Sequence, residues 1–303
     1  MEKCVMALGT FDGVHIGHRR VIGKARDIAR AAHQITKVFT FSDHPKKDVP
    51  LLTDPREKSA RLLEAGADDV ISRPFDTVRD LSPEQFIWWM IGEFGAGHFV
   101  CGEDFRFGKD GAGDVETLRR IARACGADVT VVEFARDAAG EKISSRTIRK
   151  FVEAGECEKT FETLGAYYTL EADVIHGKGL AHKWGTPTLN QRIPSGRVRP
   201  KYGVYVTLAE TDGEQNIAVT NVGVRPSFED GDAPNMETYI IDRILGEIPR
   251  ARIRFLKYLR QESRFDSEKE LSMQIARDIQ AAKRLWRDRR ENGFGKTGKT
   301  EKQ

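Results

Sequence analysis

The chain lacks the features that mark a secreted, disulfide-stabilised or membrane-spanning protein. Its 303 residues include four cysteines, Cys4, Cys101, Cys125 and Cys157, and no two of them form a Cys-x-x-Cys pair. Wide spacing without clustered histidines predicts reduced thiols in the cytoplasm rather than a disulfide framework or a metal cage. No apolar run approaches the roughly 18 residues that span a membrane. The apolar run at the N-terminus is too short for a signal peptide.

A strong net charge and internal repeats are also missing. The formal charge of +3 is too small to indicate nucleic acid by itself. Apolar residues make up 39% of the chain and charged residues 31%, so it can bury cores beneath a solvated surface. The length suggests about two domains. We expect small-molecule partners, with neither nucleic acid nor membrane, and the sequence leaves open whether the chain forms a homo-oligomer.

One stretch near the N-terminus carries the clearest chemical pattern. Gly-Thr-Phe-Asp-Gly-Val-His-Ile-Gly-His, from Gly9 to His18, follows a short apolar run and precedes an amphipathic segment. This order predicts a strand, a glycine turn and a helix whose free N–H groups can bind an anion. His15 and His18 are three positions apart and share a helix face. We interpret the stretch as a phosphate-binding loop; two ordinary polar residues at a helix start are the alternative.

The first half of the chain alternates predicted strands with predicted helices. Such alternation is typical of a mostly parallel α/β sheet, in which ligands bind beyond the carboxyl ends of the strands. Loops at Gly9, Phe41 and Gly102 each follow a predicted strand and should meet at one edge. The predicted strands are residues 4–8, 37–41, 69–71, 98–101 and 129–134, and the predicted helices are residues 19–33, 54–66 and 115–125, with another beginning at 82.

A second polar cluster ends this half. Ile-Ser-Ser-Arg-Thr-Ile-Arg, from Ile143 to Arg149, places two hydroxyls and two arginines at a predicted helix start. Serine can cap a helix or contact phosphate oxygens, and arginine offers a planar fork of donors. A capped surface helix with exposed arginines is the alternative. Because the histidine loop lies in the same half, we favour a polyphosphate site.

The second half has a different pattern of residues. After a helical linker at 155–164, short strands separated by glycine, proline and asparagine turns predict a small antiparallel barrel. These strands are residues 167–174, 203–208, 217–222 and 236–241. A final helix should pack on the barrel, and the basic segment from Arg289 should be disordered. The packing face of that helix is predicted to contain Leu271, Ile275, Ile279, Ala282 and Trp286.

Taken in order, these motifs resemble the bacterial bifunctional riboflavin kinase/FMN adenylyltransferase family (FAD synthetase). The first half shows the histidine loop, Gly-Glu-Asp-Phe-Arg-Phe-Gly from Gly102, and the Ile143–Arg149 cluster. The second half shows Gly-Thr-Pro-Thr-Leu-Asn ending at Asn190, then Tyr-Gly-Val-Tyr from Tyr202. Thr-Asn-Val-Gly-Val-Arg-Pro from Thr220 follows, with a later glutamate. The resemblance covers roughly residues 5 to 286.

The resemblance implies two activities on two domains. A Rossmann-like nucleotidyltransferase domain at 1–158 would transfer AMP from ATP to FMN, giving FAD and pyrophosphate. A six-stranded barrel with a C-terminal helix at 162–288 would phosphorylate riboflavin to FMN with ATP and Mg²⁺. Residues 289–303 would form the disordered tail.

The resemblance also implies roles for individual residues. In the adenylyltransferase, ATP would be bound by Gly9, Phe11, His15, His18, Ser144, Ser145, Arg146 and Arg149, with His18 also catalytic, and the flavin by Phe41 and Asp104. In the kinase, ATP would be bound by Gly177, Lys178, Gly179, Thr188 and Asn190, with Mg²⁺ on Thr188 and Asn190 and Glu237 as the catalytic base.

Departures from the family pattern keep other interpretations open. Arg146-Thr147 reverses the usual order, Leu189 replaces a usual alanine, and the turn after Asp242 is shortened. The chain could be a divergent paralogue, a single-activity adenylyltransferase with an impaired kinase, or a non-catalytic flavin-binding regulator. A class I aminoacyl-tRNA synthetase shares the tetrapeptide from His15 to His18, but its Lys-Met-Ser-Lys-Ser partner is absent from this sequence.

Overall fold

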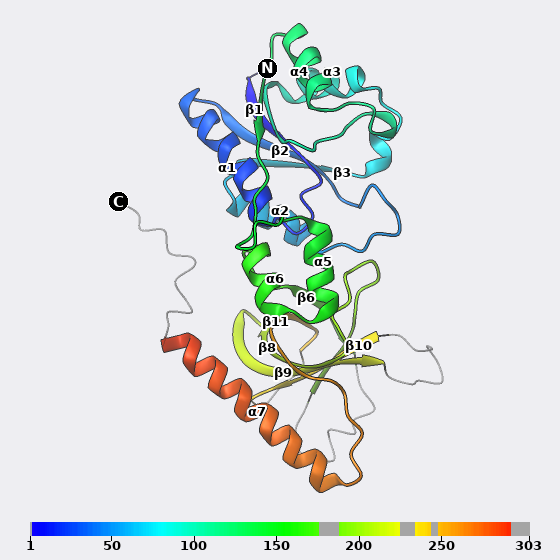
Figure 1. Ribbon diagram of the computed structural model, residues 1–303, viewed down its shortest axis with the longest axis vertical. Helices are drawn as coiled ribbons and strands as arrows, with labels where there is room; N and C mark the ends of the chain where they lie inside the picture. Colours follow the sequence, from blue (N-terminus) through cyan, green and yellow to red (C-terminus); the bar gives the residue numbers. More distant parts are fainter. Residues whose placement is uncertain (1, 176–187, 225–233, 244–247, 292–303) are drawn as a thin grey trace. The chain divides into compact units, whose positions relative to one another are not determined.

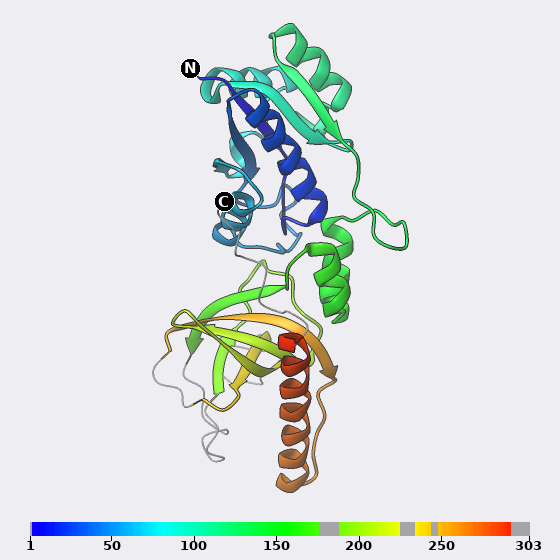
Figure 2. The same cartoon turned by 90° about the vertical axis from the view of Figure 1, so that its left-hand side faces the viewer.

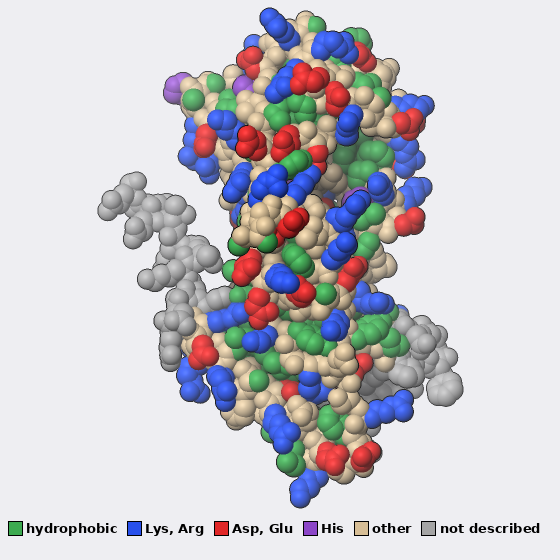
Figure 3. Space-filling model, viewed as in Figure 1, with side chains coloured by type: hydrophobic (Ala, Val, Ile, Leu, Met, Phe, Trp, Pro, Cys, Tyr) green, Lys and Arg blue, Asp and Glu red, His purple; other side chains and the backbone are tan. Residues whose placement is uncertain are grey.

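The computed structural model describes residues 2–175, 188–224, 234–243 and 248–291 (Figure 1). They form two compact units that interleave in the sequence. The first unit contains residues 1–150, 162–166 and 196–198, and the second contains the remainder. The domain limits of 1–158 and 162–288 stay a prediction. On the face drawn in Figure 3, basic and acidic side chains are interspersed, as the balanced composition suggests.

The first unit is built on a five-stranded parallel sheet of order β3-β2-β1-β4-β5 (Figures 1 and 2), so the predicted α/β fold is confirmed. The chain reverses its direction of travel across the sheet between β1 and β4, where ligands of such folds bind. The strands are β1 (Cys4–Leu8), β2 (Ile35–Phe41), β3 (Asp69–Arg73), β4 (Ala96–Gly102) and β5 (Asp128–Val132). The α-helices of this unit are α1 (Ile16–Ala31), α2 (Pro55–Glu64), α3 (Pro83–Phe94) and α4 (Val115–Ala124). Helices α5 (Ser145–Ala154) and α6 (Cys157–Leu164) each have residues in both units.

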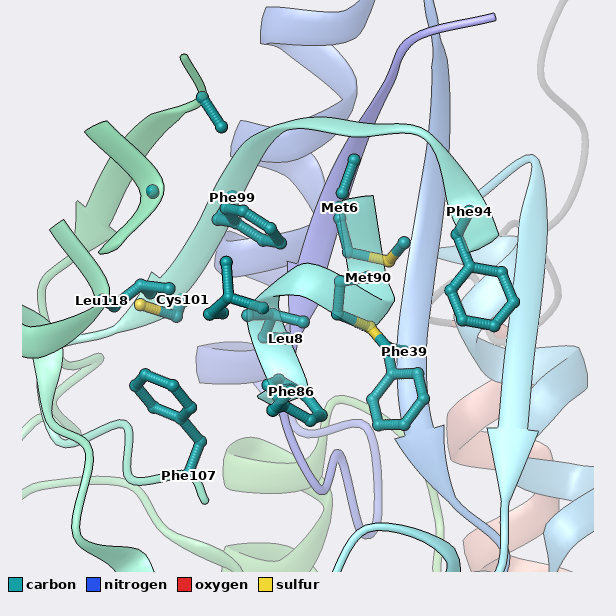
Figure 4. Close-up of a cluster of buried hydrophobic side chains, with 14 of the residues drawn as sticks. Met6, Leu8, Phe39, Phe86, Met90, Phe94, Phe99, Cys101, Phe107 and Leu118 are labelled. Atoms are coloured by element: carbon teal, nitrogen blue, oxygen red, sulfur yellow. The ribbon is translucent and has the colours of Figure 1, made fainter. Parts of the chain in front are cut away.

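Both faces of the sheet are covered by helices. Along β1, Cys4, Met6 and Leu8 enter a cluster with α3 and α4, whereas Val5 and Ala7 enter another with α1. A strand buried on both faces is apolar at every position, which explains the uninterrupted run that the sequence shows. Figure 4 shows the larger cluster, in which aromatic rings and methionines from strands and helices interdigitate.

Local sequence signals set the helix ends of this unit. Ser82 caps α3 in a reciprocal capping box with Gln85, and Pro83 occupies the first turn. Gly95 ends the helix with a φ of 73°, a left-handed conformation that favours glycine. Asp54 caps α2 by accepting a hydrogen bond from the Glu57 N–H. The helix starts predicted at 54 and 82 are therefore confirmed.

The second unit contains a closed antiparallel barrel of order β10-β7-β6-β11-β8-β9, which confirms the predicted architecture. The four strands identified in the sequence correspond to β6, β8, β9 and β10. Two strands were not predicted: β7, which is short and polar, and β11, in which basic and apolar residues alternate. The strands are β6 (Thr169–Ile175), β7 (Thr188–Arg192), β8 (Gly203–Thr211), β9 (Glu214–Val224), β10 (Pro234–Ile240) and β11 (Arg250–Arg260).

Helix α7 (Glu268–Glu291) packs on the outside of the barrel (Figure 2). Ile279, Ala282 and Trp286 contact the barrel cluster, as predicted. Ile275 is 42% exposed, so its assignment to the packing face is wrong. The helix continues to Glu291, so the tail predicted to begin at Arg289 does not begin there. Residues 292–303 lie outside the described residues.

Side chains alternate between the two faces of the barrel wall. Thr207, Thr220 and Thr238 are fully buried and form a chain of hydroxyls across β8, β9 and β10, with oxygen–oxygen distances of 2.8 and 2.9 Å. Asn221 and Glu237 follow and precede two of these threonines in sequence, so they lie on the opposite face. That is the outer face, on which α7 also packs.

Candidate active sites

The loop from β1 to α1 has a strained backbone. Phe11 and Val14 have φ values of 49° and 48°, and for a β-branched residue such as Val14 this conformation is costly. Gly13 also has a positive φ, of 85°. A Cβ atom on Gly13 would lie 3.0 Å from the Leu52 side chain and 3.1 Å from that of Leu164. Surrounding contacts thus hold the loop in a shape that other sequences would not adopt.

His15 and His18 lie together at the start of α1, as the sequence predicted. His15 is the N-cap residue, and its Nδ1 accepts a hydrogen bond from the backbone N–H of His18 at 3.3 Å. The two rings stack with centroids 3.5 Å apart, and the Phe11 ring meets His18 edge-on. A Cβ at Gly17 would lie 3.1 Å from the His15 ring, which explains the glycine between them.

Both imidazoles are neutral at neutral pH. Burial lowers the pKa of His15 to about 4, and burial together with the neighbouring His15 and Lys58 holds the pKa of His18 well below its usual value. Because His15 Nδ1 accepts a hydrogen bond, its ring proton lies on Nε2. His18 Nδ1 is buried and has no hydrogen-bond partner within the described part of the chain. Such an atom is one that a bound ligand can satisfy.

Asp12 links this loop to residues 50–54, a role that the sequence analysis did not assign. Its buried carboxylate accepts hydrogen bonds from the N–H groups of Leu52 at 2.9 Å and Thr53 at 3.3 Å. It also accepts one from Arg149 Nη2 at 2.6 Å. In return, the Thr53 hydroxyl accepts a hydrogen bond from the Gly13 N–H at 3.1 Å. The central position of Asp12 in the glycine-rich stretch was the available signal.

The Ser144–Arg149 cluster reaches the same loop. Ser144 caps α5 by accepting a hydrogen bond from the Thr147 N–H, and the Ser145 hydroxyl donates to the Asp12 carbonyl at 2.9 Å. Arg149 donates from Nε to the Pro50 carbonyl at 2.7 Å in addition to its bond with Asp12. Arg146 is exposed. The geometry makes Arg149 an organiser of the loop, and ATP contacts by these side chains stay predictions.

Lys58 is a further polar residue that the sequence analysis missed. It is 1% exposed, and its ammonium donates to the carbonyls of Thr10, at 3.3 Å, and Phe41. Burial lowers its pKa, while Asp12 and Asp43 oppose that shift. A lysine on the buried face of α2, beside Leu62, was the sequence signal. It places a cation between the loops that follow β1 and β2.

The two predicted flavin contacts lie at or just beyond strand ends: Phe41 is the last residue of β2, and Asp104 follows β4. The Phe41 ring is half-buried and packs edge-on against Phe39 and Phe75. The Asp104 carboxylate pairs with Lys142 at 2.7 Å and raises the pKa of His15, against the larger effect of burial. These positions agree with a site at the carboxyl ends of the strands, but flavin binding by either residue stays a prediction.

The barrel brings together the residues predicted for the second site. The Thr188 hydroxyl donates to Glu237 Oε1 at 2.9 Å, and Asn190 lies directly opposite Glu237 in the β10–β7 ladder. Asn221 lies opposite Glu237 on the other side, and its Oδ1 is buried without a hydrogen-bond partner within the described ranges. The predicted glycine loop of Gly177, Lys178 and Gly179 lies outside the described residues.

The second site offers oxygen donors of the kind that a magnesium ion binds. Among the described residues no group of three His, Cys, Asp or Glu side chains could hold a metal. Thr188, Asn190 and Glu237 instead offer a hydroxyl, an amide carbonyl and a carboxylate, all hard oxygen donors. Mg²⁺ commonly takes few protein ligands and completes its shell with water and phosphate. The residues therefore fit the ion.

A parallel sheet with a stacked histidine pair at its switch point, together with a carboxylate-bearing barrel, is the arrangement expected of a transferase with two sites. Comparisons with known proteins specify it further. Residues 1–147 match the family model described as FAD synthetase, and residues 164–286 match the one described as riboflavin kinase.

Curated relatives match over nearly the whole chain. The bifunctional riboflavin kinase/FMN adenylyltransferase of Listeria monocytogenes is 35% identical, over 91% of this chain and 90% of that protein. The Bacillus subtilis protein of the same description is 34% identical, over 95% and 94%. The chain therefore belongs to the bifunctional riboflavin kinase/FMN adenylyltransferase family, as the resemblance in its motifs predicted.

A solved structure has the same fold. A protein described as a macrolide-efflux protein of Streptococcus pneumoniae superposes with a TM-score of 0.85 at 27% identity, covering 93% of this chain and 94% of that one. None of the helices in the described ranges is long and apolar enough to cross a membrane. The aminoacyl-tRNA synthetase alternative finds no support, since both halves match the flavin family.

Proposed function

We propose that the chain makes FAD from riboflavin in two ATP-dependent steps, one in each unit. Membership of the family makes it a transferase of FAD biosynthesis, with riboflavin, FMN and ATP as substrates. The assignment of one step to each unit rests on the presence of two separate polar sites in one chain. One is the His15–His18 pair, and the other is the Thr188–Glu237 pair.

In the first unit, a phosphate oxygen of FMN attacks the α-phosphate of ATP in line, and pyrophosphate leaves. This chemistry needs no protein nucleophile, so catalysis is positioning and charge stabilisation. His18 and His15 donate hydrogen bonds to phosphate oxygens as neutral imidazoles. Lys58 adds a buried positive charge behind the loop. Ser144, Ser145 and Arg146 lie where α5 begins, next to Asp12, and contact the rest of the triphosphate.

In the barrel, the terminal ribityl hydroxyl of riboflavin attacks the γ-phosphate of a second ATP, and ADP leaves. Glu237 accepts the hydroxyl proton, because one of its oxygens is held by Thr188 and the other is available as a base. Mg²⁺, held by Thr188 and Asn190, would neutralise charge on the phosphates. Gly177–Gly179 are proposed as the remaining ATP contacts.

The remaining assignments complete this proposal. We place the reaction in the cytoplasm, where the free thiols of Cys4, Cys101 and Cys157 stay reduced. The partners are small molecules rather than nucleic acid, and the chain works either as a monomer or as a homo-oligomer. The sequence-based limits of 1–158 and 162–288 serve as working domain boundaries.

Incubation of the protein with riboflavin, ATP and Mg²⁺, followed by chromatography, tests the proposal. FMN and then FAD are the expected products. FAD from supplied FMN, without conversion of riboflavin, would leave a single-activity adenylyltransferase. Tight flavin binding without any product would instead indicate a regulator.

A further inference from the structure

Arg197 belongs to the riboflavin kinase match in sequence but to the first unit in structure. Residues 196–198 cluster with the first unit. The Leu51 N–H donates to the Gly196 carbonyl at 2.7 Å, and the Val198 N–H donates to the Leu51 carbonyl at 3.1 Å. These bonds form a parallel bridge between Leu51 and Arg197.

The side chain of Arg197 is 5% exposed and is surrounded by acceptors. Nη2 donates to the Leu52 carbonyl at 2.8 Å, and Nε donates to the Leu51 carbonyl at 3.3 Å. The guanidinium also pairs with the carboxylates of Asp54 at 3.3 Å and Glu57 at 3.4 Å. Several charge-assisted bonds to one planar fork fix both the position and the orientation of the backbone they reach.

This backbone is the one that holds the histidine loop. Asp12 takes its backbone hydrogen bonds from Leu52 and Thr53, so residues 50–54 lie between Asp12 on one side and Arg197 on the other. Glu57 provides a second path, because it also accepts Arg61 Nη2 at 2.6 Å. Arg61 Nη1 in turn donates to the Gly13 carbonyl at 3.3 Å.

We infer that Arg197 is a positioning residue for adenylyl transfer, supplied by the kinase half of the sequence. The inference rests on the proposed adenylyltransferase site. Arg197 touches no substrate; it orders residues 50–54 and, through Asp12 and Arg61, the strained loop that presents His15 and His18. Without it, the Leu52 carbonyl and the Asp54 carboxylate lose their buried partner, which is costly. A fragment that ends near residue 160 retains the histidines but lacks this support.

The test uses the full chain with Arg197→Ala, Arg197→Lys and the control Arg199→Met, whose side chain is exposed two positions away. In Arg197→Ala, kcat for FAD formation from FMN should fall at least tenfold, while FMN formation from riboflavin by the same preparation stays within twofold. Lysine keeps the charge without the fork, so Arg197→Lys should recover only part of the rate. Added guanidinium ion should partly rescue Arg197→Ala, and Arg199→Met should match the wild type.

Three results separate the alternatives. A wild-type chain that forms no FAD from FMN would refute the proposed function itself. If the wild type forms FAD and Arg197→Ala forms it at a rate within twofold of the wild type, only the role of Arg197 is overturned. If both Arg197 variants lose the cooperative unfolding of the first unit together with activity, and guanidinium restores neither, Arg197 is a structural residue and the inference is also overturned.

Discussion

The two sites hold their polar groups in different ways. In the first unit, the buried His15 and the half-buried His18 lie at the start of α1, directly after a strained loop that Asp12, Arg149 and the backbone of residues 50–54 hold in place. In the barrel, Glu237 stands on a regular strand, half-exposed, and the ladder register alone places it beside its neighbours. A site built on register tolerates changes around it, whereas a site built on a buried network depends on each member.

The largest expected effect is on FMN formation at the barrel site, which the ladder register positions. Glu237→Gln keeps the size of the side chain and its hydrogen bond to Thr188 but removes the base. General-base catalysis contributes about 10²–10⁴-fold, so FMN formation should fall by that factor. FAD formation from supplied FMN should not change. Glu214→Gln, a change at an exposed carboxylate near the β8–β9 turn, is the matched control.

Two outcomes of this experiment would contradict the role of Glu237 as the base of the barrel site. If both activities fall together in Glu237→Gln, Glu237 is structural. If neither falls, the base lies elsewhere. Steady-state rates for the two half-reactions, measured separately on one preparation, distinguish these results.

The next largest effect is expected in the buried network. Asp12→Asn places an amide where two backbone N–H groups and Arg149 require an acceptor. Breaking a buried ion pair by removing one partner costs roughly 3–5 kcal/mol. The first unit should lose about that much unfolding free energy in urea, and FAD formation should fall with it, while FMN formation persists. Asp27→Asn, at an exposed pair, should leave both unchanged; a stable Asp12→Asn protein would show that the network is dispensable.

His18→Ala separates chemistry from support within that network. Removal of the imidazole should lower FAD formation from FMN by an order of magnitude or more, at about 1.4 kcal/mol per tenfold. Folding should be affected less than in Asp12→Asn, since His18 Nδ1 has no partner to lose among the described residues. His33→Asn, at an exposed position with a positive φ of 52°, is the control. A wild-type rate of FAD formation in His18→Ala would refute the site.

The contrast between the two sites also explains which parts of the structure could be predicted from the sequence. Alternation of apolar runs and helical segments was enough to predict the parallel sheet, and the turn-rich second half was enough to predict a barrel. Of the barrel strands, β7 was missed because Thr188–Arg192 is mostly polar. The assignment of Ile275 to the packing face failed because helical periodicity does not tell where along a long helix the contact ends.

The residues of the sites also divide into those that a local sequence pattern predicts and those that it does not. The short motifs contain His15, His18 and Thr188, whereas Glu237 was assigned only through the family resemblance, from its place after the stretch that begins at Thr220. Arg197 contacts residues more than 140 positions earlier in the chain, and no local pattern reports such a partner.

The smallest predicted effect is a pH dependence that arises from the buried His15. The pKa of His15 is lowered to about 4 by burial, from 6.5 when unfolded. Below pH 6.5 the unfolded chain therefore binds a proton that the folded chain does not. Stability is unaffected by this group above pH 6.5 and falls as the pH drops toward 4. Between pH 7 and pH 5.5 the loss is about 1 kcal/mol from His15 alone, and His18 adds to it in the same direction.

His15→Asn tests this pH dependence and keeps an N-cap side chain that can accept the His18 N–H. Its unfolding free energy should depend less steeply on pH between 7 and 5.5 than that of the wild type. Urea unfolding at each pH, with hydrogen exchange of the α1 amides to assign the first unit, measures the difference. An equal slope in His15→Asn and wild type would mean that burial does not lower the pKa of His15, and a buried, neutral imidazole would then no longer distinguish the first site from the barrel.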